Sequence, residues 1–307
     1  MVKRLLVSAT LAALTLSTIL PAATVAQDKS ICMVTFSLQI AYFQNSVAGA
    51  QMAADELGVD LTVLDPQADA GRQVTQVEDC LSQQPDAIIV DPIESSSLTG
   101  VLGEAAEAGI PVATLDTPVD SPAIVTWIGV DQYSASNTFG QFIAGYIIGA
   151  LGGEAKVGIM LASTEVQLLR RDGFVDALAA VPGAEVVAEG DGRNILERAT
   201  AEAEDMLTAN PDINVIYATG DPQLQGALAA GEAQGRDIAF FGWDEIPEPF
   251  IAPLEDGRIV GFLMQKPALG GEMAVRLLVD HLNGEQIPAR FTYTPDVVTQ
   301  YNLEQFR

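Results

Sequence analysis

The sequence contains few residues that could carry out catalysis or hold a metal ion. Its 307 residues include one histidine, His281, and two cysteines, Cys32 and Cys80. A Ser-His-Asp or Cys-His site would need His281, whose charged surroundings are typical of a solvated side chain. The chain also lacks a glycine-rich dinucleotide motif after its first predicted strand, a phosphate-binding loop and a nucleophile elbow. We therefore expect no enzymatic activity, no cofactor and no metal site.

Positive charge is scarce as well. The sequence has 15 lysines and arginines against 41 aspartates and glutamates, so its formal net charge at pH 7 is −26. A surface this acidic repels phosphate groups, which argues against nucleic acid and an anionic membrane as partners. The simplest interpretation is a solvated surface whose charges keep the molecules apart.

Long apolar runs are absent except near the N-terminus. Lys3 and Arg4 precede an apolar stretch over 5–20, and small residues follow at 24–26, an order typical of a secretory signal. Hydroxyl residues interrupt the stretch, which is short for a membrane span. We predict that 1–26 is a cleaved signal peptide and that the exported, soluble chain begins near Gln27. Loss of Lys3 and Arg4 would lower the net charge from −26 to −28.

The two cysteines have two interpretations. Export permits a disulfide bond. Cys32 lies on the first predicted strand and Cys80 on the second predicted helix, so they can be bridged if their Cβ atoms lie within bonding distance. The alternative is a pair of buried thiols that pack as small apolar side chains.

Apolar runs of strand length end, one after another, on an acid or an amide. These ends are Asp65, Asp91, Asp116, Asp131, Asp221, Asp244 and Gln265. Stretches with helical periodicity lie between the runs, and strands that alternate with helices predict buried parallel sheets. Ligands of such sheets bind beyond the carboxyl ends of the strands. The polar ends of the runs therefore predict a binding site.

The alternation falls into two series, which predict two lobes. In the first we expect helices over 42–57, 70–83 and 96–108 and strands over 31–36, 59–65, 86–91 and 110–116. In the second we expect helices over 134–151, 166–180, 195–209 and 224–234 and strands over 156–161, 184–188, 213–217, 238–243 and 259–264. A long helix to residue 282 and extended residues near 290–300 complete the chain. A mature length of about 280 residues is enough for two lobes.

The order and spacing of several short segments match a known family. They are Thr35-Phe36-Ser37 with Tyr42-Phe43 downstream, IPVATLD ending at Asp116, RRDGF containing Arg170, TGD ending at Asp221, FGWD ending at Asp244, and Gln265 before Lys266-Pro267. Over 31–301 the chain resembles periplasmic sugar-binding proteins of the ribose-binding type, which serve ABC importers. The resemblance implies an α/β fold of two Rossmann-like, doubly wound lobes that close on a small polyhydroxylated ligand.

The resemblance also implies how the chain is divided and where it acts. Three crossings between lobes are expected near Val130, Gln265 and Thr294. The N-terminal lobe would comprise 27–130 with 266–294, and the C-terminal lobe 131–265 with 295–307. The expected location is the periplasm. The expected partners of this monomer are a sugar or polyol, an ABC permease in the inner membrane and, for a sensory role, a chemoreceptor.

The predicted site combines two kinds of side chain. Charged and amide groups can hold pairs of sugar hydroxyls, and aromatic rings can cover the apolar C–H face of a sugar. The polar candidates are Gln39, Asp116, Thr117, Arg170, Asn194, Asp221, Asp244 and Gln265, and the aromatic candidates are Phe36, Tyr42, Phe43 and Trp243. Of the aromatic residues, Phe36 and Trp243 at strand ends are favoured for stacking, and at least one of Tyr42 and Phe43 is expected in the core.

Several charged residues have a second interpretation. Asp65 and Asp91 precede predicted helices, where we expect them to cap the helix N-terminus. Asp221 also precedes a helix, so capping and ligand binding are equally expected. Arg171 could take the role of its neighbour Arg170.

The chain departs from the ribose-type pattern at five positions, namely Phe36, Ile40, Thr117, Asn194 and Gly220. Ribose itself is therefore not implied, and another pentose, a hexose or a cyclic polyol fits equally well. Three functions follow as hypotheses. The first is delivery of a ligand to a permease, the second is ligand sensing through a chemoreceptor or sensor kinase, and the third is an enzyme acting on a sugar, against which the missing motifs argue.

Overall fold

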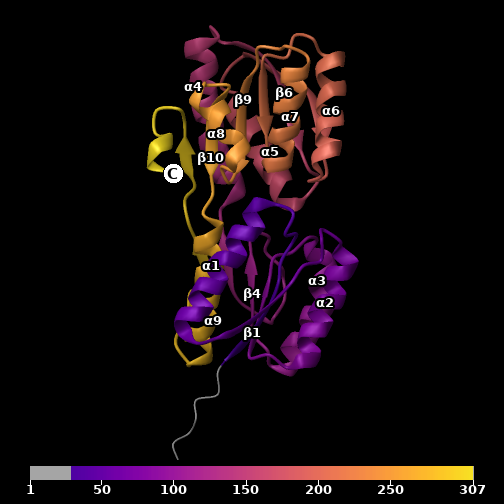
Figure 1. The fold of residues 1–307 in the computed structure, drawn as a ribbon, viewed down its shortest axis with the longest axis vertical. Helices are drawn as coiled ribbons and strands as arrows, with labels where there is room; N and C mark the ends of the chain where they lie inside the picture. The colour runs from indigo at the N-terminus through magenta and orange to yellow at the C-terminus, as the bar shows by residue number, and fades with distance from the viewer. Residues whose placement is uncertain (1–28, 307) are drawn as a thin grey trace, which may run out of the picture.

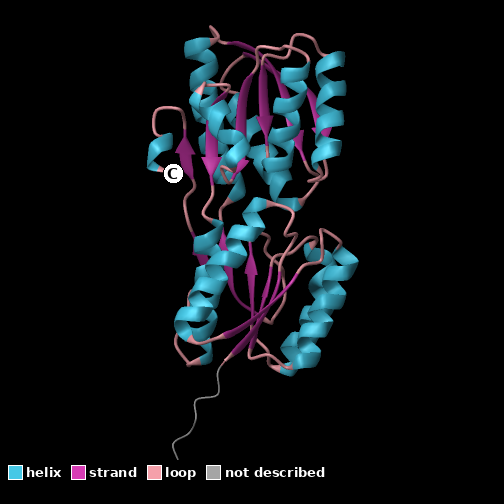
Figure 2. Cartoon of the chain, in the orientation of Figure 1, coloured by secondary structure: helices cyan, strands magenta, loops and turns pink. Residues whose placement is uncertain are grey.

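The computed structural model describes residues 29–306, which form two α/β lobes set end to end (Figure 1). The predicted signal peptide lies outside the described residues. Each lobe is built on a six-stranded sheet, and helices cover both faces of each sheet (Figure 2). The prediction of two α/β lobes with parallel sheets is confirmed.

The N-terminal lobe combines the first part of the chain with two later elements. Its strand order is β11-β5-β4-β3-β1-β2, and all neighbouring strands are parallel. The strands are β1 (Ser30–Val34), β2 (Asp60–Leu64), β3 (Ala87–Val90), β4 (Val112–Leu115), β5 (Ile124–Gly129) and β11 (Arg290–Thr292). The helices are α1 (Ala41–Leu57), α2 (Ala70–Gln83), α3 (Ser95–Ala108) and α9 (Pro267–Leu282).

The C-terminal lobe has strand order β12-β10-β9-β8-β6-β7 and is parallel except for its edge strand β12, which runs antiparallel to β10. The strands are β6 (Glu154–Leu161), β7 (Gly183–Asp191), β8 (Val215–Ala218), β9 (Ala239–Asp244), β10 (Ile259–Met264) and β12 (Asp296–Val298). The helices are α4 (Gln132–Ala150), α5 (Glu165–Leu178), α6 (Leu196–Ala209), α7 (Asp221–Ala233) and α8 (Glu248–Glu255), followed by a 3₁₀ turn, η1 (Leu303–Gln305). Within residues 29–306, no helix is both long and apolar enough to cross a membrane.

Successive side chains of β1 enter opposite halves of the N-terminal core. Ile31 and Met33 pack in the apolar cluster under α1 and α9, and Cys32 and Val34 pack in the cluster under α2 and α3. A strand whose side chains are buried on both sides needs helices on both faces of its sheet. This packing explains why the strands appear in the sequence as continuous apolar runs.

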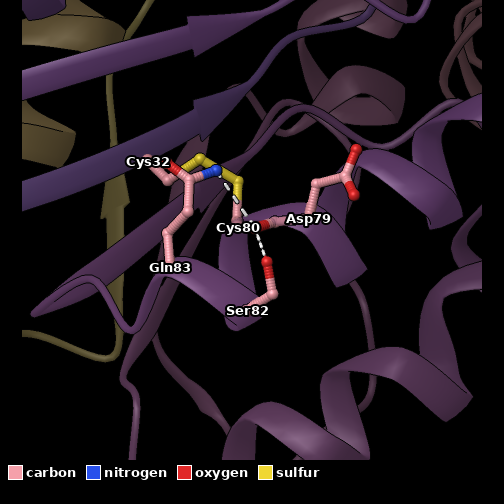
Figure 3. Close-up of a disulfide and its surroundings, with 5 residues drawn as sticks. All are labelled: Cys32, Asp79, Cys80, Ser82 and Gln83. Atoms are coloured by element: carbon pink, nitrogen blue, oxygen red, sulfur yellow. Dashed lines mark hydrogen bonds between the residues drawn. A yellow bond between two sulfur atoms is a disulfide. The ribbon is translucent and has the colours of Figure 1, made fainter.

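A disulfide bond lies in the second of these clusters. Cys32 on β1 and Cys80 on α2 are bonded, with Cα atoms 5.9 Å apart, and Figure 3 shows the bridge together with the last turn of α2. The structure therefore shows the disulfide bond and not the alternative of two buried thiols. It joins an inner strand of the sheet to a helix that covers it.

The chain passes between the two sheets three times, between β5 and α4, between β10 and α9, and between β11 and β12. After the second passage α9 returns to the N-terminal lobe, where it packs along α1 (Figure 1). The backbones of the two helices approach closely. A Cβ atom added to Gly49 would lie 1.9 Å from the Ala268 carbonyl oxygen, and one added to Gly271 would lie 1.9 Å from the Ser46 carbonyl oxygen. Only glycine permits this contact.

One helix was not predicted. Helix α8 lies in a segment that contains Pro247, Pro249 and Pro253, a composition that indicates a loop. Pro249 lies in the first helical turn, where proline is tolerated because backbone N–H groups there have no partner within the helix. Pro253 lies inside the helix. Helices α1 and α3 end at Gly58 and Gly109, which adopt left-handed φ angles of 67° and 71°, a conformation that glycine adopts without strain.

Candidate functional site

A narrow pocket lies between the lobes, which we call the cleft pocket. Both lobes contribute residues to its wall. We predicted from the sequence that a binding site lies beyond the carboxyl ends of the parallel strands. The lining residues are Phe36, Ile40, Tyr42, Phe43, Asp91, Pro92, Ile93, Asp116 and Thr117 from the N-terminal lobe and Thr164, Val166, Gln167, Arg170, Asn194, Pro222 and Asp244 from the C-terminal lobe.

A buried ion pair forms the floor on the C-terminal side. The Arg170 guanidinium, on α5, donates from Nη1 to Asp244 Oδ1 at 2.7 Å and to the Thr219 carbonyl oxygen at 2.7 Å. Asp244 also accepts hydrogen bonds from Gln265 Nε2 and from the Asp221 backbone N–H. The pair is thus buried with many of its hydrogen-bonding atoms satisfied, which is the condition under which a buried ion pair is stable.

Gln132 links this ion pair to the opposite lobe. Its Oε1 accepts from Arg170 Nε at 2.8 Å, and its Nε2 donates to Asp116 Oδ1 at 2.6 Å. Gln132 is the first residue of α4, just after the first passage between the sheets. Asp116 and Asp244, at the two ends of this relay, are non-glycine residues with positive φ angles, 55° and 94°. Such strained backbone is concentrated at functional sites.

An aromatic wall lies on the N-terminal side. The rings of Phe36 and Phe43 are stacked with centroids 4.8 Å apart and planes within 4°, and Tyr42 meets Phe43 edge-on. The Tyr42 and Tyr293 hydroxyls are hydrogen-bonded to each other. Flat rings at the pocket wall can cover the C–H face of a sugar ring.

An amide wall faces the rings from the C-terminal lobe. Gln167 Oε1 accepts from the Ala162 N–H and the Thr219 hydroxyl, which directs Gln167 Nε2 to Asn194 Oδ1 at 2.7 Å. Gln223 Nε2 donates to the same oxygen at 3.0 Å. Because both donors occupy Asn194 Oδ1, the Nδ2 amide group of Asn194 is left to donate to a ligand.

Two polar contacts cross the cleft beside the pocket. The N–H and hydroxyl of Ser95, at the start of α3, both donate to Glu165 Oε1 at the start of α5, at 3.3 and 2.5 Å. The side chains of Asn45 on α1 and Glu245 after β9 are also hydrogen-bonded. The two lobes are therefore in contact across the mouth of the pocket.

The structure brings most of the expected residues together in the cleft pocket. Those that line it are Phe36, Tyr42, Phe43, Asp116, Thr117, Arg170, Asn194 and Asp244. Arg170, and not its neighbour Arg171, takes the central position, because Arg171 forms ion pairs with Asp172 and Glu189 on the surface of the C-terminal lobe.

Four expected residues lie elsewhere. Gln39 and Asp221 line an adjacent hollow, and Gln265 is buried behind Asp244, to which it donates. Trp243 is fully buried in the C-terminal core, where its Nε1 donates to the Tyr217 hydroxyl and its ring lies under the Arg170 guanidinium, 4.4 Å from ring centroid to Cζ. The expectation that Trp243 stacks on a ligand is thus corrected, because alternation along β9 turns the ring inward and leaves Asp244 at the pocket.

The expected helix caps are also corrected. Asp69 caps α2, and its Oδ1 accepts from the Arg72 N–H, whereas Asp65 accepts from the N–H groups of Leu38 and Gln67 in loops. Asp91 caps no helix, since the residue at the N-cap of α3 is Glu94. Asp91 lines the cleft pocket instead. Asp91 ends an apolar run in the sequence, as Asp116 does, but so does Asp65, which lies outside the pocket.

Gln132 and Gln167 were not predicted from the sequence. Both lie in the first turn of a helix, at positions where glutamine gives no distinctive pattern. Their roles depend on residues that are distant in the sequence. Gln132 contacts Asp116, 16 positions away, and Gln167 contacts Asn194, 27 positions away. Among the described residues, no group of three or more histidine, cysteine or acidic side chains is arranged to hold a metal ion.

Burial makes the side chains of Asp91, Asp116 and Glu245 weaker acids. It raises the pKa of Asp116 to about 6, against the lowering effect of the Arg170 guanidinium and with a further increase from Asp244. Burial and the Asp116 charge hold the pKa of Asp91 well above its usual range. Burial and Asp244 raise the pKa of Glu245 to about 7. The site therefore holds more acid groups than its single guanidinium can neutralise.

These shifts predict how the stability of the ligand-free protein depends on pH. Asp116 has a pKa of 3.8 unfolded and about 6 folded, so between these values the folded state binds more protons than the unfolded state. The free energy of unfolding should then fall as pH rises from about 4 to 6, by about 3 kcal/mol for Asp116 alone. Glu245 acts in the same direction up to about pH 7.

Urea unfolding at pH 4.5 and pH 7 measures this dependence. The Asp116→Asn variant is the control, because it cannot ionise and should show a weaker dependence than the wild type. Equal slopes in the two proteins would contradict the assignment of the effect to Asp116.

Comparison with known proteins agrees with this architecture. Residues 31–286 match the model of the periplasmic binding protein domain family. The chain is 30% identical over 289 residues to the ribose import binding protein RbsB of Escherichia coli (strain K12), covering 91% of this chain and 93% of that protein.

Two solved structures extend the comparison. A glucose-galactose binding protein, GanP, from Geobacillus stearothermophilus is 27% identical, with a TM-score of 0.83 over 90% of this chain and 99% of the other. An ABC transporter periplasmic solute binding protein from Actinobacillus succinogenes 130Z with bound D-allose is also 27% identical, with a TM-score of 0.82 over 91% of this chain and all of the other. The matches cover both lobes and therefore the whole cleft.

Proposed function

Because the chain belongs to the periplasmic binding protein family, we propose that it captures a monosaccharide or a cyclic polyol between its lobes and delivers it to an ABC permease of the inner membrane. The cleft pocket is the observation that carries this proposal. Its stacked rings lie opposite amide donors, with carboxylates and a guanidinium at its floor. Such a wall matches a ring that has an apolar face and hydroxyl groups around its edge.

The remaining parts of the proposal concern location and partners. An export signal at 1–26 would place the protein in the periplasm, where the disulfide between Cys32 and Cys80 can form. Two of the relatives named above are described as an import binding protein and an ABC transporter solute binding protein, which supports a permease as the recipient. We propose that the protein acts as a monomer, with 27–130 and 266–294 in one lobe and the rest of the mature chain in the other.

A thermal-shift screen over pentoses, hexoses and cyclic polyols tests the proposal. A ligand present at 100 times its dissociation constant should add about 2.7 kcal/mol to the free energy of unfolding. Mass spectrometry of the recovered ligand tests the accompanying expectation that it is returned unchanged. A screen without any stabilising sugar or polyol, or turnover of a bound sugar, would contradict the proposed function.

Asp116→Asn should weaken binding of the sugar that the screen identifies by about 1.5–3 kcal/mol, or roughly 10- to 100-fold. The reason is that the variant loses a charged acceptor in a desolvated pocket. Calorimetric titration measures the affinity. Asp69→Asn is the matched control, because Asp69 caps α2 on the protein surface away from the pocket and should leave the affinity unchanged. Equal affinities of the two variants would remove Asp116 from the site.

A further inference from the structure

The cleft pocket contains more acidic than basic side chains, and this excess indicates the charge of the ligand. We propose that the ligand carries a protonated amino group, as an amino sugar or an amino polyol does, and that Asp91 and Asp116 hold this group. The inference rests on the proposed function, since it assumes a polyhydroxylated ligand, and it adds the charge of that ligand.

The one basic residue among the described residues that line the pocket is already engaged. Arg170 directs Nη1 to Asp244 and to the Thr219 carbonyl oxygen, and Nε to Gln132. Its positive charge is therefore compensated mainly by Asp244, 2.7 Å away and on the same lobe. Asp116 forms no ion pair with Arg170 and is hydrogen-bonded instead to the neutral amide of Gln132.

Among the described residues, Asp91 has no positively charged partner. Its side chain lines the pocket and the residue is 1% exposed. Its Oδ2 atom is buried without a hydrogen-bond partner. The titratable groups that act on or near it are Asp116, Tyr42 and Tyr293, and none of them is a cation. A buried carboxylate in this position needs either a proton or a positive charge from a ligand.

Asp91 and Asp116 are placed to share one group. They follow β3 and β4, which are neighbouring parallel strands with Val90 paired to Thr114. Neighbouring strands lie about 4.8 Å apart. This register sets Asp91 opposite Leu115, one position before Asp116, and the positive φ of 55° at Asp116 ends the strand alternation there. Both residues line the cleft pocket, and the Asp116 charge acts on Asp91. An ammonium group supplies three N–H donors and a positive charge to such a pair, whereas a hydroxyl supplies one donor and no charge.

The pocket wall of the C-terminal lobe determines how the ligand is oriented. Asn194 presents its Nδ2 donors to the pocket, because Gln167 and Gln223 occupy its oxygen. Donors on the C-terminal side suit hydroxyl oxygens. On the N-terminal side, Asp91 and Asp116 form no ion pair with a described residue and suit a cation. The pocket is therefore complementary to a molecule with an amine at one end and hydroxyl groups at the other.

Matched probes test this inference. Calorimetric titrations and thermal shifts would compare D-glucosamine, D-glucose and N-acetyl-D-glucosamine, the same trio built on D-galactose, and 1-amino-1-deoxy-D-sorbitol with D-sorbitol. We expect at least one amine to bind at least tenfold more tightly than its neutral parent and its acetylated form. Asp91→Asn, which keeps the size of the side chain, should reduce this preference to about twofold or less. Asp65→Asn, which alters a strand-end carboxylate outside the pocket, should keep it.

The outcomes separate the inference from the function on which it rests. Tighter binding of a neutral sugar than of every amine would overturn the charged ligand and leave a sugar-binding protein. An amine preference that survives Asp91→Asn would overturn the assignment to this pair of carboxylates. Absence of binding by the amines and by every neutral sugar of the wider screen would overturn both proposals.

Discussion

Replacing Arg170 with alanine should lower the free energy of unfolding by about 3–5 kcal/mol, the cost of leaving a buried charge without its partner. The structure shows why the effect is large. Asp244 would lose its ion pair, the Thr219 carbonyl oxygen would lose a donor, and the Trp243 ring would lose the guanidinium that covers it. Ligand binding should also weaken, because Arg170 lines the pocket. Urea unfolding without ligand measures the stability loss.

The neighbouring arginine provides the control. Arg171→Ala removes a guanidinium from the same turn of α5, but its ion pairs with Asp172 and Glu189 lie at the surface, where a pair contributes about 0–1 kcal/mol. Adding Asp244→Asn to Arg170→Ala should recover part of the loss, because the uncompensated charge is then gone. Equal stability of the Arg170→Ala and Arg171→Ala variants would contradict the role of the buried pair.

Removing the disulfide should cost about 4 kcal/mol. The bond joins residues separated by 48 positions, and in the chain-entropy account a loop of this length restricts the unfolded state by about that amount. The double variant Cys32→Ala, Cys80→Ala avoids a buried hydroxyl group, and it should unfold at lower urea concentration than the wild type.

Reductant supplies the internal control. Dithiothreitol should shift the unfolding midpoint of the wild type towards that of the double variant and leave the double variant unchanged. A wild-type midpoint that is the same with and without reductant, and the same as that of the double variant, would show that the bridge does not stabilise the fold.

Most helices and strands of the fold could be predicted from the periodicity of the sequence. Helix α2 was predicted with the bounds that the structure has, and so was strand β10. These elements depend on periodicity and on local stop signals such as Gly58, which act over a few residues. Helix α8 was missed for the same reason, because three prolines give a local signal for a loop and only tertiary packing of Phe250 and Leu254 into the core overrides it.

The candidate site was only partly predictable. Strand-end acids marked the correct edge of each sheet, but the sequence could not tell a pocket residue from a cap. Asp65 and Asp91 carry the same signal, yet Asp65 closes a loop and Asp91 lines the cleft. Trp243 and Asp244 are consecutive, and the side on which β9 packs decides which of them faces the ligand.

The sequence by itself determined the two βα series, the acidic surface and the edge of each sheet at which polar residues gather, because these depend on composition and on short-range periodicity. Only the tertiary structure decided which of those residues meet. Arg170 and Asp244 are 74 positions apart, and Asp116 reaches Arg170 through Gln132 from the other lobe. Such contacts depend on how helices pack on a sheet and how two lobes face each other, and neither property is encoded in any single segment of the chain.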